Sequence, residues 1–303
     1  MFIFGFNSCI PKDYQNDVYV KLLTDTFLHF KTIKDSYPNE IDGIITHLYA
    51  SDYILNKNKI TLADCIGYLN REIRILAYTY FSKFPIESFY HIVDEDSLLS
   101  NKYSIVVDNT SYDATREKIV YDNTGILFTL ALHTDLRIDN LTIHDNSQNH
   151  FSVLNLFGED TNTKYLLSVI EKDIFNKLDN FNKFTALIGK CKYNSKFKKD
   201  FEALTYETQI RLLSRIVEAK NRKLVTNLAS DNHLIKDVTP TKENQIRLFE
   251  LRIFNPVAIR LYFFETTDMV FLASIKKKPQ TRVQDNDIVN SLSIIKEMIS
   301  ISN

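Results

Sequence analysis

Hydrophobic and polar residues follow two different periods along the first 182 residues. Apolar residues recur at helical spacing from Tyr14 to Phe30, and residues 61–64 have the form of a capping box that opens a helix ending near Phe81. Short apolar runs between Asn, Asp and Gly residues then predict strands at 103–108, 118–121, 126–133 and 136–143, and a helical pattern covers 164–181. The pattern predicts a helix-first α+β domain with an antiparallel meander; a distorted α/β sheet is the alternative.

From Phe184 onward the pattern predicts one compact unit. An opening strand at 186–191 precedes helices at 195–204 and 206–222, and strands follow at 247–254, 257–264 and 269–275. The intervening turns favour an antiparallel meander, and a short helix from about Asp287 to Ile299 closes the chain. The predicted class is therefore α+β. A mixed α/β domain of unknown fold covers residues 1–182, and a second domain covers residues 183–303.

Charge is divided unequally between these two domains. The 303-residue chain has 37 Lys+Arg and 38 Asp+Glu, a net charge of −1. Residues 1–182 hold 16 Lys+Arg and 25 Asp+Glu, a balance of −9, and residues 183–303 hold 21 and 13, a balance of +8. The total argues against a nucleic-acid partner, whereas the basic part favours one. Opposite charges also predict intramolecular docking of the acidic domain onto the basic one.

Several classes of protein and of site are excluded by composition. The uncharged apolar runs are far shorter than the ~20 residues that span a bilayer, and the start MFIFGFNSC lacks the basic region of a signal peptide. We therefore expect a cytoplasmic protein without a membrane partner. Cys9, Cys65 and Cys191 are widely spaced, which predicts buried thiols rather than disulfides or a zinc site. Known nucleotide-binding loops are absent, so neither a metal nor a cofactor is predicted.

Basic residues gather on one helix and one loop of the second domain. In the helix at 206–222, Ile210, Leu213 and Val217 share the side that is expected to pack, and the other side carries three cations: Arg211, Arg215 and Arg222. The loop 276–282 holds four more cations, namely Lys276, Lys277, Lys278 and Arg282. Such clusters produce a strong local field for phosphate, so they are candidate RNA-binding residues. For the helix, an ordinary solvated face is the alternative.

Two arginines lie inside apolar strands, where neutral residues would pack better. Arg252 lies in FELRIF and Arg260 in VAIRLYFF. A buried guanidinium without a partner is costly, so each must meet a carboxylate or line a solvated groove. A three-residue loop at 254–256 would pair Glu250 with Arg260 and place Arg252 on the same face. This register gathers the three residues beside the basic loop; a surface ion pair without further function is the alternative.

The second domain resembles the RelE/HigB toxin superfamily, in particular its phage-derived HigB-like branch. The resemblance rests on a helix pair, SKFKKDFEALTYETQIRLLSRIVEA, followed in order by FELRI, AIRLYFF and ASIKKKPQTR. It covers roughly residues 184–303, about 40% of the chain, and does not extend to residues 1–182. The resemblance implies a RelE-like fold, an antiparallel sheet with two N-terminal helices and a short C-terminal helix.

The resemblance also implies a function, that of a metal-independent, ribosome-dependent mRNA endoribonuclease that inhibits translation. Arg260 and Arg252 match basic positions of the central strands, Glu250 matches the glutamate of the HigB-like branch, and Lys276 and Lys278 match the basic loop. These five are the candidate catalytic residues. Family members carry a C-terminal Tyr or His for proton transfer, but this sequence has Asp-Asn-Asp-Ile at 285–288, so Asp287 or Tyr262 would have to substitute.

The implied partners are mRNA and the ribosome, with an antitoxin or a phage-derived ligand acting on the first domain as a sensor or regulator in phage defence. Two other functions are alternatives. In one, the RelE-like part has lost catalysis and serves as an RNA-binding or ribosome-binding module. In the other, residues 1–182 are the enzyme and the basic part recruits nucleic acid.

Overall fold

The computed structural model of the chain contains two compact units, Met1–Glu171 and Lys172–Asn303. It describes residues 2–89, 95–221, 234–255, 257–277 and 281–301. The first unit has 14 Lys+Arg and 23 Asp+Glu and the second has 23 and 15, so the balances of −9 and +8 also hold for these units. The sequence-based boundary after residue 182 lies within a helix of the second unit. Within the described ranges, no helix is both long enough and apolar enough to cross a bilayer.

A mixed sheet forms the centre of the first unit, in the order β2-β1-β5-β7-β6-β3-β4. Neighbouring strands are parallel from β2 to β7 and antiparallel from β7 to β4. The strands are β1 (Phe2–Phe6), β2 (Ile41–Ile45), β3 (Tyr103–Val107), β4 (Thr110–Asp113), β5 (Ile126–Phe128), β6 (Asn140–Asp145) and β7 (His150–Leu156). The carboxyl ends of β1, β2, β5 and β7 therefore lie along one edge of the sheet.

Helices cover both faces of this sheet, as adjacent residues of β1 show. The rings of Phe4 and Phe30, in α1 (Asn16–Ser36), have centroids 5.0 Å apart. A Cβ atom on Gly5 would lie 2.3 Å from Val120 of α6 (Thr115–Asp122), so glycine permits the close approach of α6. Since adjacent strand residues point to opposite faces, α1 and α6 cover opposite faces. The other helices are α2 (Leu62–Gly67), α3 (Arg71–Tyr80), α4 (Ile86–Phe89), α5 (Glu95–Ser100), the 3-10 helix η1 (Thr134–Leu136) and α7 (Asp160–Lys177).

The predicted helix-first antiparallel meander is wrong for this unit. Strand β1 precedes the first helix, and the centre of the sheet is parallel, as the alternative α/β sheet would have it. Both β1 and β2 are short buried runs that contain a glycine, a pattern that periodicity alone does not assign to a strand. The predicted strand at 118–121 lies in α6, because so short an apolar run fits a buried helix equally well.

The predicted capping box is confirmed, but the helix that it opens is shorter than expected. Thr61 accepts a hydrogen bond from the Asp64 backbone N–H, and the Asp64 carboxylate accepts one from the Thr61 backbone N–H. This helix, α2, ends at Gly67. The Asn70 side chain then accepts a hydrogen bond from the backbone N–H of Ile73 and caps a separate helix, α3. A second cap residue within the apolar pattern therefore divides the predicted helix in two.

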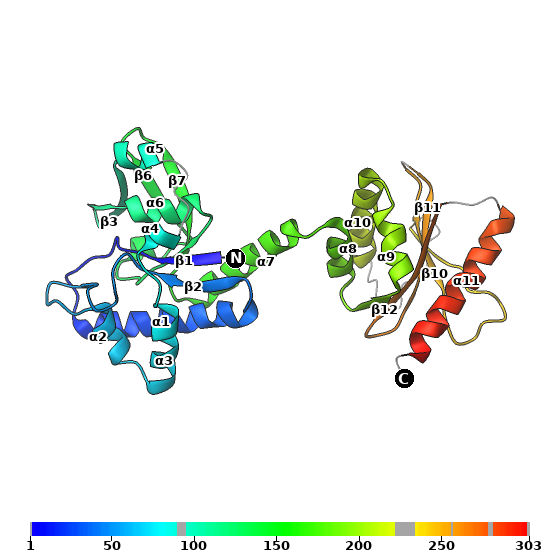
Figure 1. The fold of residues 1–303 in the computed structure, drawn as a ribbon, viewed down its shortest axis with the longest axis horizontal. Helices are drawn as coiled ribbons and strands as arrows, with labels where there is room; N and C mark the ends of the chain where they lie inside the picture. The colour runs from blue at the N-terminus through cyan, green and yellow to red at the C-terminus, as the bar shows by residue number, and fades with distance from the viewer. Residues whose placement is uncertain (1, 90–94, 222–233, 256, 278–280, 302–303) are drawn as a thin grey trace. The chain divides into compact units, whose positions relative to one another are not determined.

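The second unit contains a sheet in the order β8-β12-β11-β10-β9 with helices on both faces (Figure 1). Its strands are β8 (Cys191–Tyr193), β9 (Ile235–Asp237), β10 (Phe249–Ile253), β11 (Ile259–Glu265) and β12 (Val270–Lys277). Helices α8 (Asn180–Ile188), α9 (Ser195–Glu202) and α10 (Tyr206–Asn221) cover one face, and α11 (Thr281–Ser300) covers the other. Leu251 of β10 packs with Leu212 of α10, whereas Tyr262 of β11 packs with Leu292 of α11.

Three expectations for this unit need correction. The first half of the predicted strand at 186–191 is helix, since α8 continues to Ile188 and is capped by Gly189, whose φ of 89° suits glycine. Strand β8 is parallel to β12, so the sheet is mixed rather than wholly antiparallel. The last helix is not short: it begins at Thr281 rather than near Asp287. The glycine that ends α8 and the pairing of β8 with β12 are not visible in the local apolar pattern.

Two side-chain expectations are also wrong. On α10, Ile210 and Val217 are exposed at 40% and 43%, because the buried side of the helix is centred on Leu212 and Ile216. A rotation of the apolar stripe by one position is enough to produce this difference. Cys191 is half-buried rather than buried, while the other two cysteines are buried as predicted.

Candidate nucleic-acid interface

A buried carboxylate, Glu250, holds two arginines on the α11 face of the second sheet. Glu250 is 0% exposed. Its Oε1 accepts a hydrogen bond from Nε of Arg252 at 2.5 Å, and its Oε2 accepts one from Nη1 of Arg260 at 3.1 Å. The arginine side chains keep 18% and 13% of their surface exposed. The predicted gathering of Glu250, Arg252 and Arg260 is therefore present in the structure.

The register of the hairpin differs from the prediction by two residues. Arg252 lies opposite Arg260, and Glu250 lies opposite Tyr262 rather than opposite Arg260. A slip of two residues preserves the face on which each side chain lies, whereas a slip of one would reverse it. Glu250 therefore still reaches both arginines, one along its own strand and one diagonally across the strand pair.

Cationic residues form a row across three neighbouring strands. Arg252 of β10 lies opposite Arg260 of β11, which lies opposite Lys276 of β12. Directly opposite residues have Cβ atoms only about 4.5–5.5 Å apart, and like charges in such positions are destabilising. One carboxylate within the row offsets part of this repulsion. The arrangement leaves a local excess of positive charge, which suits a phosphate group that contacts several cations at once.

Tyr262 and α11 lie beside this row. Tyr262 is fully buried against Leu292 and Ile295, and its hydroxyl lies near the guanidinium group of Arg260. Burial and, secondarily, the Glu250 charge raise the pKa of Tyr262 to about 12. The hydroxyl thus keeps its proton at neutral pH and can donate a hydrogen bond, but it is a poor general base. A buried hydrogen bond of 2.8 Å between Ser274 and Ser291 fastens α11 to β12 nearby.

The predicted basic loop is divided between two elements. Lys276 and Lys277 belong to strand β12, where Lys276 is half-buried and Lys277 is exposed. Arg282 lies in the first turn of α11, with its side chain outside the described residues, and Lys278 lies wholly outside them. Within the described part of the chain, Lys276 and Lys277 make no ion pair. The contiguous strand pairing explains why the strand continues through these lysines.

The cationic side of α10 lies apart from the row. Helix α10 packs against the face opposite to that of Glu250, through Leu212 and Ile216. Arg211 is exposed, and Arg215 forms an ion pair with Glu218 at 2.6 Å. Arg222 lies outside the described residues. The structure therefore does not bring Arg211 and Arg215 together with the row on β10, β11 and β12.

An exposed aromatic ring at the end of the hairpin was not among the predicted site residues. Phe254 is 51% exposed and lines, with Arg252 and Arg260, a small hollow of about 110 Å³. Unpaired bases stack on exposed aromatic rings and on guanidinium planes. The sequence does show an aromatic residue directly before the Asn-Pro turn, but Phe254 was counted there as the last residue of the predicted strand at 247–254.

Comparisons with known protein families, with curated proteins and with solved structures find no match to this chain.

Proposed function

We propose that residues 172–303 form a RelE/HigB-like unit that binds mRNA on the ribosome and cleaves it without a metal ion. The row Arg252–Arg260–Lys276 with its buried Glu250 is the observation that carries this proposal. A packing role alone would not favour cations opposite one another on three strands. The strand segments FELRI and AIRLYFF, which carry the resemblance, supply three members of this cluster.

The proposed reaction is an internal transesterification. The 2′-oxygen of one nucleotide attacks the adjacent phosphorus and forms a new O–P bond, while the bond from phosphorus to the 5′-oxygen of the next nucleotide breaks. Solvent water takes the proton of the 2′-hydroxyl, and solvent water supplies the proton that the leaving 5′-oxygen gains. The phosphorane carries additional negative charge, which Arg252, Arg260 and Lys276 stabilise more strongly than the ground state. RNA stacking on Phe254 would hold the strand beside the row.

Glu250 serves as a positioning residue in this scheme rather than as the base. It has no exposed surface, and both carboxylate oxygens accept hydrogen bonds from guanidinium groups. A general base must approach the proton that it removes to within about 3 Å, and Glu250 is enclosed by its two partners. Its effect is to fix the orientation of the guanidinium planes, which preorganises the row for phosphate.

Binding without cleavage is the second candidate function. Tyr262, one of the two substitutes expected for the family's C-terminal Tyr or His, is fully buried and has a pKa of about 12. It is therefore poorly suited to accept the proton of a 2′-hydroxyl at neutral pH. A unit with this row but without efficient proton transfer would hold RNA or ribosomal RNA through phosphate contacts and would block translation by occupancy.

Mapping of mRNA 5′ ends after induction of the full chain tests the two candidates. The wild-type chain should produce new ends in translated messages, and Arg260→Ala should remove them. Because Arg260→Ala also alters the partner of Glu250, Arg260→Lys is a second variant that retains the charge but not the planar guanidinium. Arg247→Ala is the matched control, since Arg247 is 69% exposed and pairs with Asp237 away from the row.

Each outcome decides between the candidates. Cleavage that disappears in both Arg260 variants but persists in Arg247→Ala supports the endoribonuclease. Cleavage that persists in a soluble Arg260→Ala protein contradicts the assignment of the row. Translation arrest without any new 5′ ends, lost in Arg260→Ala, favours the binding module.

A further inference from the structure

The connections of the first sheet diverge at one point of its carboxyl edge. Strand β1 continues through α1 to β2 on one side, whereas β5, its other neighbour, continues through β6 to β7 on the other side. All four of β2, β1, β5 and β7 are parallel. In open sheets of this kind, ligands bind outside the carboxyl ends of the strands where the connections diverge. The loop that follows β1 is therefore the first place to look for a ligand site.

Buried hydrogen bonds hold the loop after β1 in place. Nδ2 of Asn7 donates to Oγ1 of Thr129, just after β5, at 3.0 Å. The backbone N–H and the hydroxyl of Ser8 both donate to Oε1 of Glu117, at 2.7 and 2.8 Å. Asn7 and Glu117 are 0% and 1% exposed. The loop is thus tied to β5 on one side and to α6 on the other, and it is preorganised rather than free to collapse.

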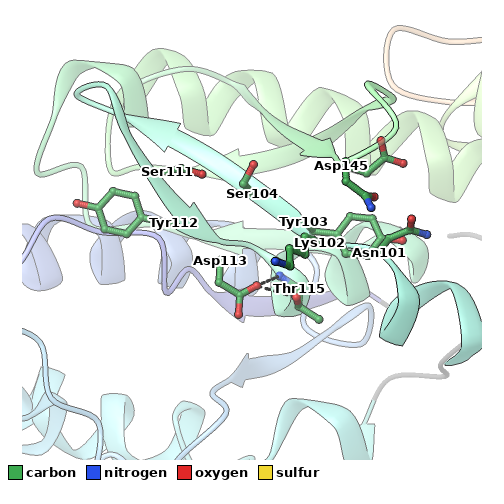
Figure 2. Close-up of a pocket in the computed structure, with 10 residues that line it drawn as sticks. Asn101, Lys102, Tyr103, Ser104, Ser111, Tyr112, Asp113, Thr115 and Asp145 are labelled. Atoms are coloured by element: carbon green, nitrogen blue, oxygen red, sulfur yellow. Dashed lines mark hydrogen bonds between the residues drawn. The ribbon is translucent and has the colours of Figure 1, made fainter.

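A pocket of about 410 Å³ opens beside this loop. Its walls come from the loops after β1 and β2, from the segment 52–54 and from the start of α6. The volume lies within the roughly 300–1,000 Å³ of small-molecule sites. A separate pocket over β3 and β4 shares Tyr112 and Asp113 with it, and Figure 2 shows Asp113 bonded there to Thr115.

Tyr53 gives this pocket a polar group that the described residues do not satisfy. The residue is 4% exposed and lines the pocket, and its ring contacts Phe6 and His47 at centroid distances of 5.0 and 4.6 Å. Its hydroxyl is buried and has no hydrogen-bond partner among the described residues. Buried polar groups in proteins are nearly always paired, so an orphaned hydroxyl at the wall of a pocket indicates a missing partner.

The other groups of the pocket define the chemistry of that partner. Lys12 and Arg116 supply positive charge, and Arg116 lies in the first turn of α6, where the helix dipole favours an anion. Lys12 makes no ion pair within the described ranges. Asp52 offers a carboxylate to hydroxyl groups, and Tyr112 offers an aromatic wall. The Asp113 carboxylate is already engaged by Thr115, at 2.6 and 3.1 Å.

We propose that this pocket binds a ribonucleotide, with its phosphate towards Lys12 and Arg116 and a polar group on the Tyr53 hydroxyl. A nucleotide is the small molecule that offers a partner to each of these groups. Its phosphate suits the cations, its ribose hydroxyls suit Asp52, and its base suits the aromatic wall of Tyr112. This site belongs to the first unit and is independent of the proposed cleavage of mRNA by the second.

Calorimetric titration of the full chain with AMP, GMP, CMP and UMP tests the proposal. At least one of the four should bind, and Tyr53→Phe should weaken that binding about tenfold, since one buried hydrogen bond is lost. Without nucleotide, the unfolding temperature of Tyr53→Phe should not fall, because the deleted hydroxyl has no hydrogen-bond partner in the described part of the chain. Tyr68→Phe is the matched control: this tyrosine is 72% exposed and should bind nucleotide as the wild type does.

Three results would overturn the proposal. The first is that none of the four nucleotides binds at millimolar concentration. The second is that Tyr53→Phe binds the best nucleotide with unchanged affinity. The third is that inorganic phosphate binds as tightly as the best nucleotide, which would make the site a nonspecific anion site.

Discussion

Replacement of Glu250 by glutamine tests how much the buried carboxylate contributes to the stability of the second unit. The variant keeps the shape of the side chain and removes a carboxylate that both arginines contact. Breaking a buried ion pair from one side costs about 3–5 kcal/mol, because the remaining charge keeps its desolvation penalty. With 18% and 13% of their side chains exposed, Arg252 and Arg260 recover little of this from solvent.

We therefore expect Glu250→Gln to lose about 3–5 kcal/mol in the free energy of unfolding of the second unit, measured by urea titration. For a unit of this size, the loss corresponds to a fall of roughly 10–20 °C in its thermal midpoint. Glu218→Gln is the matched control. It breaks the Arg215–Glu218 pair, whose carboxylate side chain is 38% exposed, and such surface pairs contribute about 0–1 kcal/mol.

A third variant separates the cost of unpaired charge from the cost of changed packing. The triple replacement Glu250→Leu, Arg252→Leu and Arg260→Leu removes the whole cluster, and apolar replacement of a buried ionic cluster is often neutral or stabilising. It should recover most of the stability that Glu250→Gln loses and should abolish RNA binding. A loss below about 1 kcal/mol in Glu250→Gln, or a triple variant that is no more stable than it, would refute the reasoning.

If three cations contact phosphates of single-stranded RNA, log affinity should fall with log salt at a slope of about −2, and Lys276→Gln should reduce that slope by about 0.7. Burial raises the pKa of Glu117 above its ordinary 4.5, so its contribution to stability is present at low pH and declines as pH rises through the folded-state pKa. Glu117→Gln should remove this decline in unfolding titrations between about pH 4 and pH 8, and an unchanged profile would assign the pH dependence elsewhere. If the acidic unit masks the basic one, residues 172–303 expressed alone should inhibit growth more than the full chain at equal protein level.

The three central strands of the second unit could be predicted from the sequence, because each is a continuous apolar run and turn-forming residues separate them. Three apolar runs separated by Asn-Pro and by a polar turn predicted β10, β11 and β12. Period two placed Glu250 and Arg252 on one face, and the assumed three-residue loop placed Arg260 on that face as well. The register itself was not accessible, since a two-residue slip keeps the same face. Local pattern determines which side of a sheet a residue occupies, and the turn geometry determines its partner.

The sheet of the first unit was harder to predict from the sequence, because no short turn connects neighbouring parallel strands. Strands β1 and β5 are neighbours although more than a hundred residues separate them, and nothing local in either run indicates the other. The grouping of Ser8, Tyr53 and Glu117 near the end of β1 depends on the pairing of β1 with β2 as well as with β5. Nothing in the sequence sets Glu117 apart from the other acidic residues; only its burial in the folded structure does so.

The sequence by itself determined the unequal charge of the two parts, the cationic strands of the second unit and the capping box at residues 61–64 of the first unit. These properties depend on residue type and on spacing over a few positions. Only the tertiary structure decided that Glu250 is buried between two guanidinium groups and that the arginines of α10 lie on the other face. It also decided that the Tyr53 hydroxyl has no hydrogen-bond partner within the described ranges. Those are properties of distance and solvent exclusion between segments far apart in the chain, which no local pattern encodes.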